Sequence, residues 1–451
     1  MIYYNKLDKQ LAQLTNFGIS FDVVRKEFGN KKKVVLYFLS SLASSQRIFE
    51  LDYSIVNIRE TDSILQVLNG SVEECDDINK AFVAVSSGMS IVIDSDKMYI
   101  VETREYPTRS VGEPDTEKTI RGSRDGFTEN IITNVGLLRR RIRSEFFTCQ
   151  IQKVGDVSQT DIAICSLSNK VNQSVLTKVI LQIQSLKIDA LVMSDRALEE
   201  HLFKQGLNPF PLVRYSERPD IIAAQILKGH IAIIVDTSSS VIILPTTIFE
   251  HAKHIEEYRQ VSIVGSFIRI IRYFAILISL FLVPIWMLTL NNENFMSNIF
   301  VKINNPSNIP ILVQILLVEL TIEVLRIATI HTPNQLSSAM GLIATLILGQ
   351  MAVEMGWFAS EVLLFCSISA IGGFATPSYE LSLANKLVKL FFIIMVGLLS
   401  GSGFIVGVYL FIMLLGSVKM FDVPYLYPLF PLDVCEFKKV VFRKVIKKTF
   451  N

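Results

Sequence analysis

Three charged residues stand inside an otherwise apolar stretch of this chain. Residues 309–330 read IPILVQILLVELTIEVLRIATI and hold Glu319, Glu323 and Arg326. Their spacing of four and then three residues puts them on one face of a helix. Ionised side chains are costly against lipid, so in a membrane helix they face a protein interior or a water-filled path. Carboxylates beside such a path favour cations.

Three interpretations of this helix stay open. It lines a watery path as a pore or gate, it lies flat in the membrane interface around a structural Glu323–Arg326 pair, or its charges pair inside a bundle. Gln350 and Glu354, on one face of the next apolar segment, extend the set of pore or gate candidates. If the helix lines the path of a ring, each copy contributes two acids and one base, which predicts a net acidic ring that prefers cations.

A second stretch carries two opposite blocks of charge. Residues 113–144 read EPDTEKTIRGSRDGFTENIITNVGLLRRRIRS. In its first part three acidic residues alternate, so an extended chain would point all three the same way. The later part predicts a helix from about 126 to 143, with Asp125 as its N-cap and one apolar face. That face is formed by Phe127, Ile131, Val135, Leu138 and Ile142.

Four arginines lie in the last turn of that predicted helix, where cations interact favourably with the helix dipole. We interpret the two charge blocks as assembly elements, because arginine binds carboxylates through two parallel hydrogen bonds. The blocks can meet between lobes of one chain or between neighbouring copies. A solvated basic helix end is the plainer alternative. The assembly candidates are Glu113, Asp115, Glu117, Arg121, Arg124, Asp125, Arg139, Arg140, Arg141 and Arg143.

Nucleic-acid binding, catalysis and metal binding are disfavoured by what the sequence lacks. The formal net charge is +2 and the basic block has no interleaved aromatic residues, which argues against a nucleic-acid partner. The segment RGSRDG lacks the spacing and the lysine of a phosphate-binding loop, and no nucleophile, zinc or dinucleotide motif occurs. His251 and His254 have no evident third ligand, and the five scattered cysteines predict reduced thiols. We therefore expect no enzyme, no cofactor and no metal.

The elements that carry these residues fall into two regions of different composition. Of the 451 residues, 50% are hydrophobic and the mean hydropathy is +0.41, which is too apolar for an ordinary soluble protein. Residues 264–418 hold only six acidic and six basic side chains, whereas residues 1–263 hold most of the charge. This contrast predicts a soluble front part and a membrane-embedded back part.

The back part contains several candidate membrane spans. The first covers 273–290, and further apolar stretches cover 336–353, 362–376 and 387–418. The last would form a helix of about 48 Å, against a hydrocarbon core of roughly 30 Å. It contains GLLSGSGFIVG, so we expect it either to bend or to make two short crossings.

Positive charge sets the expected orientation in the membrane. Arg259, Arg269 and Arg272 precede the first span, and the tail segment EFKKVVFRKVIKK holds six basic residues. Since basic flanks stay in the cytoplasm, both termini are expected there, which requires an even number of crossings. Four crossings are our expectation and six are the alternative.

The front part mixes strand and helix patterns. Strands are predicted for KKVVLYFLS, TDIAICSL and IDALVMS, with a helix at SVLTKVILQIQSL. Two hairpins with an aspartate at the turn are predicted for GMSIVIDSDKMYIV and GHIAIIVDTSSSVIIL, and their likeness hints at two related lobes. The predicted fold is a two-lobed α/β soluble N-terminal part followed by an α-helical polytopic membrane domain. The expected domains are an N-terminal α/β lobe (1–145), a second α/β lobe (146–263), a transmembrane helical domain (264–420) and a basic cytoplasmic tail (421–451).

Several longer motifs point to one family. They are EPDTEKTIRGSRDGFTENIITNVGLLRRRIR, YSERPDIIAAQILKGHIAIIVD, VGSFIRIIRYFAILISLFLVP, ELTIEVLRIA, LILGQMAVEMG and FATPSYELSLANKLVK. From about residue 20 to about residue 433 the chain closely resembles the A-subunit family of bacterial spore germinant receptors, the GerA family. The details GSRDGF and EPDTE and the short basic tail are nearer to the branch of stage V sporulation protein AF.

This resemblance implies a location, an assembly and a function. Such proteins lie in the inner membrane of dormant spores, and the A subunits are thought to form ring oligomers, pentamers, that conduct ions. Receptor A subunits work with a transporter-like B subunit and a lipoprotein C subunit. The AF branch instead resembles a channel that amplifies the germination response with a small membrane partner.

An ion-conducting homo-oligomer is therefore our first expectation for the function. The alternatives are an A subunit of a nutrient germinant receptor, a non-conducting scaffold of the germination machinery and, less favoured, a transporter for the spore solute dipicolinate. The acidic residues of the apolar segments favour conduction over scaffolding. The lack of an evident inverted repeat counts against a transporter.

Overall fold

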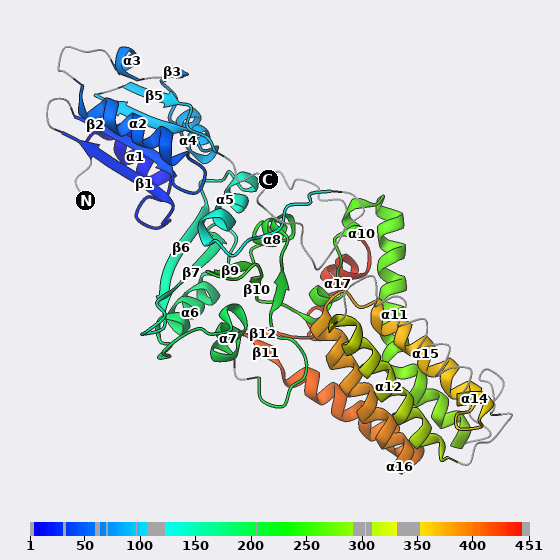
Figure 1. Ribbon diagram of the computed structural model, residues 1–451. Coiled ribbons are helices and arrows are strands. Elements are labelled where there is room, and N and C mark those ends of the chain that lie inside the picture. The colour runs from blue at the N-terminus through cyan, green and yellow to red at the C-terminus, as the bar shows by residue number, and fades with distance from the viewer. Residues whose placement is uncertain are drawn as a thin grey trace. The chain divides into compact units, whose positions relative to one another are not determined.

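Two five-stranded sheets and a bundle of long helices make up the chain (Figure 1). The computed structural model describes residues 4–29, 33–58, 64–68, 71–95, 97–105, 122–203, 205–291, 303, 309–331 and 352–443. These residues belong to two compact units. The front unit comprises Met1–Lys204 and Val213–Thr246, and the helical unit comprises Gln205–Leu212 and Thr247–Asn451.

The first lobe of the front unit is a sheet covered by helices on both faces. Its elements are α1 (Lys6–Leu14), β1 (Val23–Phe28), β2 (Val34–Leu39), α2 (Ser45–Val56), α3 (Ile64–Val67), β3 (Val72–Cys75), α4 (Ile78–Ser86), β4 (Ser90–Asp94) and β5 (Lys97–Val101). The strands are antiparallel, in the order β1-β2-β4-β5-β3. Alternate side chains of β2 enter two different cores, one shared with α1 and α4 and the other with α2 and α3. This double burial explains why β2 is a continuous apolar run.

The second lobe repeats this arrangement. Its elements are α5 (Ile131–Arg141), β6 (Phe147–Val154), β7 (Thr160–Leu167), α6 (Gln173–Gln184), α7 (Ser194–Leu202), β8 (Arg214–Ser216), α8 (Pro219–Ile226), β9 (Ile231–Val235) and β10 (Val241–Leu244). The strand order β6-β7-β9-β10-β8 is the order of the first sheet, and two helices followed by one helix occupy the same connections in both lobes. The predicted hairpins, now β4–β5 and β9–β10, and the predicted likeness of the lobes are confirmed.

Two predicted elements of the front unit were wrong. The helix α5 begins at Ile131 with Asn130 as its N-cap, not near residue 126 with Asp125, because side-chain bonds hold the preceding segment outside the helix. The segment IDALVMS forms no strand among the described residues. The carbonyl oxygens of Ile188 and Asp189 instead accept hydrogen bonds from the turn after β6, at Asp156 and Val157.

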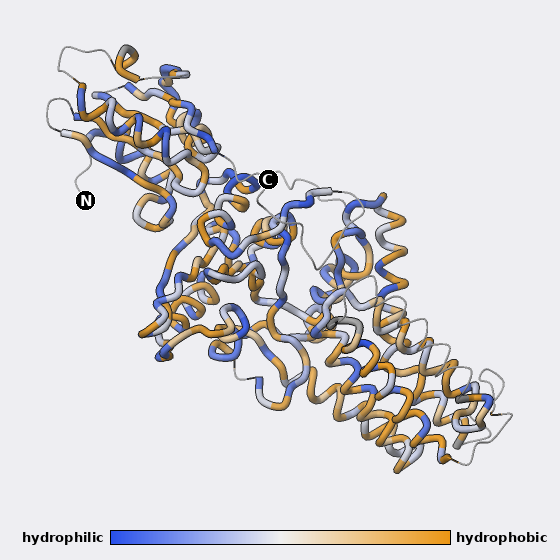
Figure 2. Tube along the Cα trace, in the orientation of Figure 1, coloured by the Kyte–Doolittle hydropathy of each residue, from blue (hydrophilic) through white to orange (hydrophobic). Residues whose placement is uncertain are grey.

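Long apolar helices dominate the helical unit, as their colouring in Figure 2 shows. Two of them, α11 and α16, are long and apolar enough to cross a membrane, and α15 is a shorter apolar helix. The predicted spans 273–290, 362–376 and 387–418 fall largely within these helices, whereas most of 336–353 lies outside the described residues. The elements are α9 (Ile248–His251), α10 (Glu256–Arg259), α11 (Ser262–Asn291), α12 (Ile311–His331), α14 (Ala352–Glu354), α15 (Ser360–Phe374), α16 (Tyr379–Ser417), β11 (Lys419–Met420), β12 (Val423–Pro424) and α17 (Val434–Val441).

The longest of these helices, α16, folds back on itself. Its backbone leaves the helical region at Ser400, where φ is 51° and ψ is −131°. Beyond this break the Phe411 ring centroid lies 6.0 Å from that of Phe392, and the same Phe392 ring packs against Gly407. A side chain at Gly407 would collide with that ring, because a Cβ atom there would lie 2.9 Å from it. The expectation was either a bend or two short crossings. The segment bends at Ser400 into two helical arms of about 26–32 Å each, and a membrane crossing by each arm stays a prediction.

The last helix among the described residues, α17, is attached to the first part of α11. Arg269, which is 1% exposed, donates to Glu257 Oε2 at 2.6 Å and to the carbonyl oxygens of Lys439 and Val440 at 3.2 and 3.0 Å. Arg272 also pairs with Glu257. Two carbonyl oxygens in the last turn of α17 therefore accept hydrogen bonds from a buried guanidinium of α11.

A buried carboxylate ties α1 to the first sheet. Asp8 accepts from Arg25 at 2.9 and 2.7 Å, from Tyr37 Oη at 2.5 Å and from the Tyr4 amide at 2.6 Å. Burial by itself raises the pKa of Asp8, but the hydrogen bonds from Arg25, Tyr37 and Tyr4 hold it below its ordinary value. Because the pKa is lower in the folded state, Asp8 stabilises the first lobe above the unfolded pKa of about 3.9 and less at lower pH.

We expect Asp8→Asn to destabilise the first lobe by about 1–3 kcal/mol at pH 7, because Arg25 and Tyr37 lose a charged acceptor. The difference between the variant and the unchanged protein should shrink as the pH falls below about 4. Hydrogen exchange of the β1 and β2 amides, corrected for its intrinsic pH dependence, measures both effects. A difference that stays constant down to pH 3 would contradict the assigned titration.

Candidate functional site: a buried charge cluster between four helices

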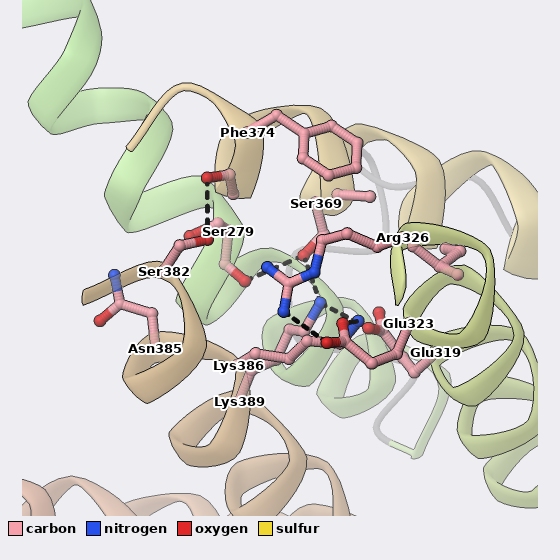
Figure 3. A pocket seen from close by; sticks show the side chains of 13 residues that line it. Ser279, Glu319, Glu323, Arg326, Ser369, Phe374, Ser382, Asn385, Lys386 and Lys389 are labelled. Carbon is pink, nitrogen blue, oxygen red and sulfur yellow. Dashed lines mark hydrogen bonds and ion pairs between the residues drawn. The ribbon is translucent and has the colours of Figure 1, made fainter. Parts of the chain in front are cut away.

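Charged and polar side chains from four helices meet inside the helical unit (Figure 3). The helix α12 supplies the three charged residues singled out in the sequence, and α16 supplies two lysines. One serine comes from α11 and another from α15. We define the buried charge cluster as Ser279, Glu319, Glu323, Arg326, Ser369, Lys386 and Lys389.

The deepest contact of this cluster joins Glu319 and Lys389. Their side chains are 1% and 5% exposed, and Lys389 Nζ lies 2.7 Å from Glu319 Oε2. The same Nζ donates to Ser369 Oγ at 3.1 Å, and Ser369 Oγ donates to the Ser279 carbonyl oxygen at 2.9 Å. Through one ammonium group, α16 is connected to α12, α15 and α11.

A second carboxylate, one turn further along α12, is shared by two cations. Glu323 Oε2 accepts from Lys386 Nζ at 2.6 Å, and Glu323 Oε1 accepts from Arg326. The Arg326 guanidinium also lies 5.3 Å from the centroid of the Tyr379 ring, within the range of a cation–π contact. Glu323 is 22% exposed, so this part of the cluster is closer to water than Glu319 is.

A small cavity separates these side chains. It has a volume of about 30 Å³, room for one or two water molecules, and Ser382 and Asn385 also line it. Glu319 Oε1 and Asn385 Nδ2 are buried and have no hydrogen-bond partner in the described part of the chain. Two residues that line the cavity therefore have a buried polar atom with unused hydrogen-bonding capacity, an acceptor on Glu319 and a donor on Asn385.

The spacing of charges along two helices explains why the ion pairs form. Glu319 and Glu323 are four residues apart on α12, and Lys386 and Lys389 are three apart on α16, so each pair shares one helical face. The two helices are in contact, and each carboxylate meets a lysine of the other helix. Without these partners the burial of either set would be strongly unfavourable.

The lysines change the charge balance that the sequence suggested. With Lys386 and Lys389, the cluster holds three cationic groups against two carboxylates, a formal sum of +1. The predicted net acidic face counted α12 alone, so its premise fails for a single chain. The missed signal was present in FATPSYELSLANKLVKL, where two lysines stand at helical spacing just before an uncharged apolar run.

Of the other two pore or gate candidates, Glu354 lies apart from this cluster. Glu354 is the last residue of the short α14, is exposed and does not line the cavity. In Figure 1, α14 lies at the end of the bundle where α15 begins, whereas Lys386 and Lys389 belong to the first part of α16. Gln350 lies outside the described residues.

The predicted assembly residues that the structure describes do not form one group. Asp125 pairs with Arg141 at 2.5 Å within the front unit. The exposed members are Arg124, Arg140 and Arg143. The members outside the described residues are Glu113, Asp115, Glu117 and Arg121.

One assembly candidate, Arg139, joins the two lobes of a single chain. It is 5% exposed, and its Nε and Nη2 atoms each lie 2.9 Å from a different carboxylate oxygen of Asp22, which directly precedes β1. Arg139 also donates to the Phe147 carbonyl oxygen at 3.3 Å and stacks on the Phe147 ring. This two-pronged contact is the geometry expected for arginine and carboxylate, here between lobes and not between copies.

Comparison with known proteins gives consistent matches along the chain. The family model described as Bacillus/Clostridium GerA spore germination protein matches residues 9–451. Stage V sporulation protein AF of Bacillus subtilis (strain 168) is 43% identical over 448 residues, which cover 96% of this chain and 91% of that protein. Spore germination protein KA of the same strain is 29% identical over 458 residues, covering 97% and 84%.

Among solved structures, one similar chain is the crystal structure of the N-terminal domain of the A subunit of the Bacillus megaterium spore germinant receptor GerK3. The TM-score is 0.40 and the sequence identity 23%. The match covers 52% of this chain and 92% of that chain.

We expect Lys389→Met to destabilise the helical unit by about 3–5 kcal/mol, because it leaves Glu319 buried without a counter-charge. The double variant Glu319→Leu/Lys389→Met removes both charges and should recover most of this loss. Thermal unfolding in detergent is compared for Glu319→Leu, Lys389→Met and the double variant. This comparison gives the coupling free energy between the two residues. Lys438→Met, on the exposed side of α17, is the matched control. Additive effects of the two substitutions would show that the 2.7 Å contact contributes little to stability.

Proposed function

The chain belongs to the GerA family of spore germination proteins, and from this we propose that it is a membrane subunit of an oligomeric ion channel acting in spore germination. We further propose that it amplifies the germination response rather than sensing nutrient, and that five copies form the channel. The relative named stage V sporulation protein AF, at 43% identity over most of both chains, supports the amplifying role over the receptor role.

The observation that carries the proposal is the buried charge cluster. Ionisable groups inside a membrane bundle are costly and mark ion paths, proton relays or ligand sites. Here α12 and α16 bring five charged side chains to one cavity, where Glu319 Oε1 and Asn385 Nδ2 still lack partners. A path for hydrated or partly hydrated ions needs such fixed charges and free polar groups.

The size of the cavity supports an oligomer. A volume of about 30 Å³ holds one or two water molecules, so this cavity by itself is too small to be an ion path. An apolar stripe on α11 offers a surface for a neighbouring copy. It consists of the exposed residues Ile263, Phe267, Ile270 and Phe274. At 30 residues α11 is about 45 Å long, so lipid tails cannot cover its whole length.

We propose the spore inner membrane as the location, with both termini in the cytoplasm. Two candidate membrane helices and the return of α16 at Ser400 support several crossings, four or six in number. The basic residues before α11 and in the tail support the orientation. A small membrane protein is the proposed partner.

Two alternatives have specific support. Spore germination protein KA and spore germination protein A1 of Bacillus subtilis match 97% and 82% of the chain, which favours an A subunit working with receptor B and C subunits. The ion pairs of Glu319 and Glu323 favour a non-conducting scaffold, in which the cluster only holds helices together. Ion flux separates the scaffold from the other two functions.

Ion flux through the purified protein in liposomes, measured in an ion gradient, tests the channel proposal. We expect Glu319→Gln to lower cation flux and to shift the reversal potential toward anions, and Lys389→Gln to shift it toward cations. Both directions follow from the charge left beside the path. The size of each shift depends on how much water the open path contains.

The charge-exchanged variant Glu319→Lys/Lys389→Glu is the matched control, because it keeps the pair and the sum of charges. It should insert, assemble and conduct more like the unchanged protein than either single variant does. Unchanged conductance and selectivity in both Gln variants, with normal assembly, would return these residues to a purely structural charge pair. No flux from the unchanged protein under any condition that preserves its oligomer would favour the scaffold.

The exposed arginines test assembly separately. We expect Arg140→Glu/Arg143→Glu to lower the oligomer mass, since both side chains are exposed at the end of α5 and we assign them to contacts between copies. The comparison variant Arg139→Glu should instead loosen the two lobes, because it opposes Asp22. Mass photometry of the oligomer and proteolysis between the lobes distinguish these effects. Unaltered oligomer mass combined with lost nucleic-acid affinity would contradict the assembly role.

A further inference from the structure

Two cysteines of the second lobe lie directly opposite each other. Cys149 on β6 and Cys165 on β7 are register partners, and their Sγ atoms are 2.6 Å apart. Both residues are 0% exposed. The charge cluster and the proposed channel make no use of them.

The backbone around Cys149 shows why these side chains come so close. The strand β6 is at the edge of its sheet, with β7 as its only neighbour in the described part of the chain. The Cys149 carbonyl oxygen accepts from the Phe21 amide at 3.0 Å, and the Cys149 amide donates to Ser20 Oγ at 3.2 Å. Both groups therefore point away from β7, so Cys149 and Cys165 form a non-hydrogen-bonded pair.

Non-hydrogen-bonded pairs of antiparallel strands are the closer kind. Their Cα atoms lie about 4.5 Å apart, which is within the range of about 4.4–6.8 Å that a disulfide spans. The backbone at Cys149 and Cys165 is thus already at the separation that the oxidised form requires. The remaining three cysteines lie on other elements and have no such opposite partner among the described residues.

We propose that Cys149 and Cys165 are a modification site, a cross-strand pair that a small-molecule disulfide converts reversibly into a protein disulfide. One cysteine thiolate attacks a sulfur of the oxidant and releases one small thiol, leaving a mixed disulfide. The second cysteine thiolate attacks the protein sulfur of that mixed disulfide and releases the other small thiol. The two protons lost by the cysteines are taken up by the two released thiolates, so two protein thiols are oxidised and one disulfide is reduced to two thiols.

The contact between the two lobes at Ser20, Phe21, Asp22 and Arg139, which we call the seam, controls access to this site. The segment of Ser20 and Phe21 covers the edge of β6 at Cys149, and the neighbouring Asp22 is held by Arg139. Burial also raises the pKa of the Cys149 thiol, which keeps the reactive thiolate scarce while the seam is closed. Exchange therefore requires the seam to open, and the oxidation rate reports that opening.

The test uses the full chain in detergent, equilibrated with mixtures of oxidised and reduced glutathione. After acid quenching, the protein is denatured and alkylated, and its mass is measured by mass spectrometry. We expect the number of alkylated thiols to fall from five to three, the mass before alkylation to fall by about 2 Da, and one peptide to link Cys149 to Cys165. Reduced glutathione in excess should restore all five thiols.

Two variants make the test decisive. In Cys149→Ala, oxidised glutathione should no longer remove two thiols together. In Cys75→Ala, it should still remove two. Arg139→Ala should increase the oxidation rate at least several-fold, because it releases Asp22 at the seam. The proposal is overturned if all five thiols are alkylated after equilibration in mild denaturant, where the seam is open. It is equally overturned if Cys149 and Cys165 each carry glutathione instead of the cross-link.

Discussion

A charge that leaves water needs an opposite charge within direct contact, and this requirement organises the helical unit. The apolar helices could pack in many registers if only their hydrophobic side chains had to be buried. Two carboxylates on α12 and two ammonium groups on α16 exclude most of those registers, because each misplaced charge would be uncompensated. The serines of α11 and α15 extend the same constraint to the other two helices through the Lys389 ammonium group.

The front unit follows the same rule at the boundary between its lobes. Each lobe has its own sheet of identical strand order, so the fold of a lobe does not specify how the two lobes meet. The contact of Arg139 with Asp22 contributes to that specification, together with the bonds of Phe21 and Ser20 to Cys149, because a two-pronged contact restricts the orientation of both groups. The hydrophobic cores thus give each lobe its stability, and paired charges give the unit its arrangement.

Elements with one strong local signal could be predicted from the sequence. The run VVLYFL, the two hairpins and the helix α6 depend on periodicity and turn residues that lie within a few positions of each other. The start of α5 was missed because Asp125 is engaged by Arg141, a partner sixteen residues away. The segment IDALVMS was wrongly predicted as a strand, because β propensity does not tell whether a neighbouring strand is available to pair with it.

The candidate site could be predicted only in part for a similar reason. Glu319, Glu323 and Arg326 were visible because charge is rare within an apolar helix, but a single helix does not reveal the side chains that another helix brings to it. Lys386 and Lys389 stand sixty or more positions away in the sequence, beyond the reach of any local pattern. The sum of charges at the cluster is therefore a property of tertiary structure.

The attachment of α17 to α11 has a consequence for how the protein is made. Arg269 and Glu257 are synthesised long before Lys439 and Val440, whose carbonyl oxygens complete the hydrogen bonding of the Arg269 guanidinium. During translation α11 is therefore complete before α17 exists, and its Arg269 guanidinium is then only partly satisfied. Only after α17 has been synthesised can this guanidinium be buried in this way, so the first part of α11 is among the last parts of the helical unit to reach its final environment.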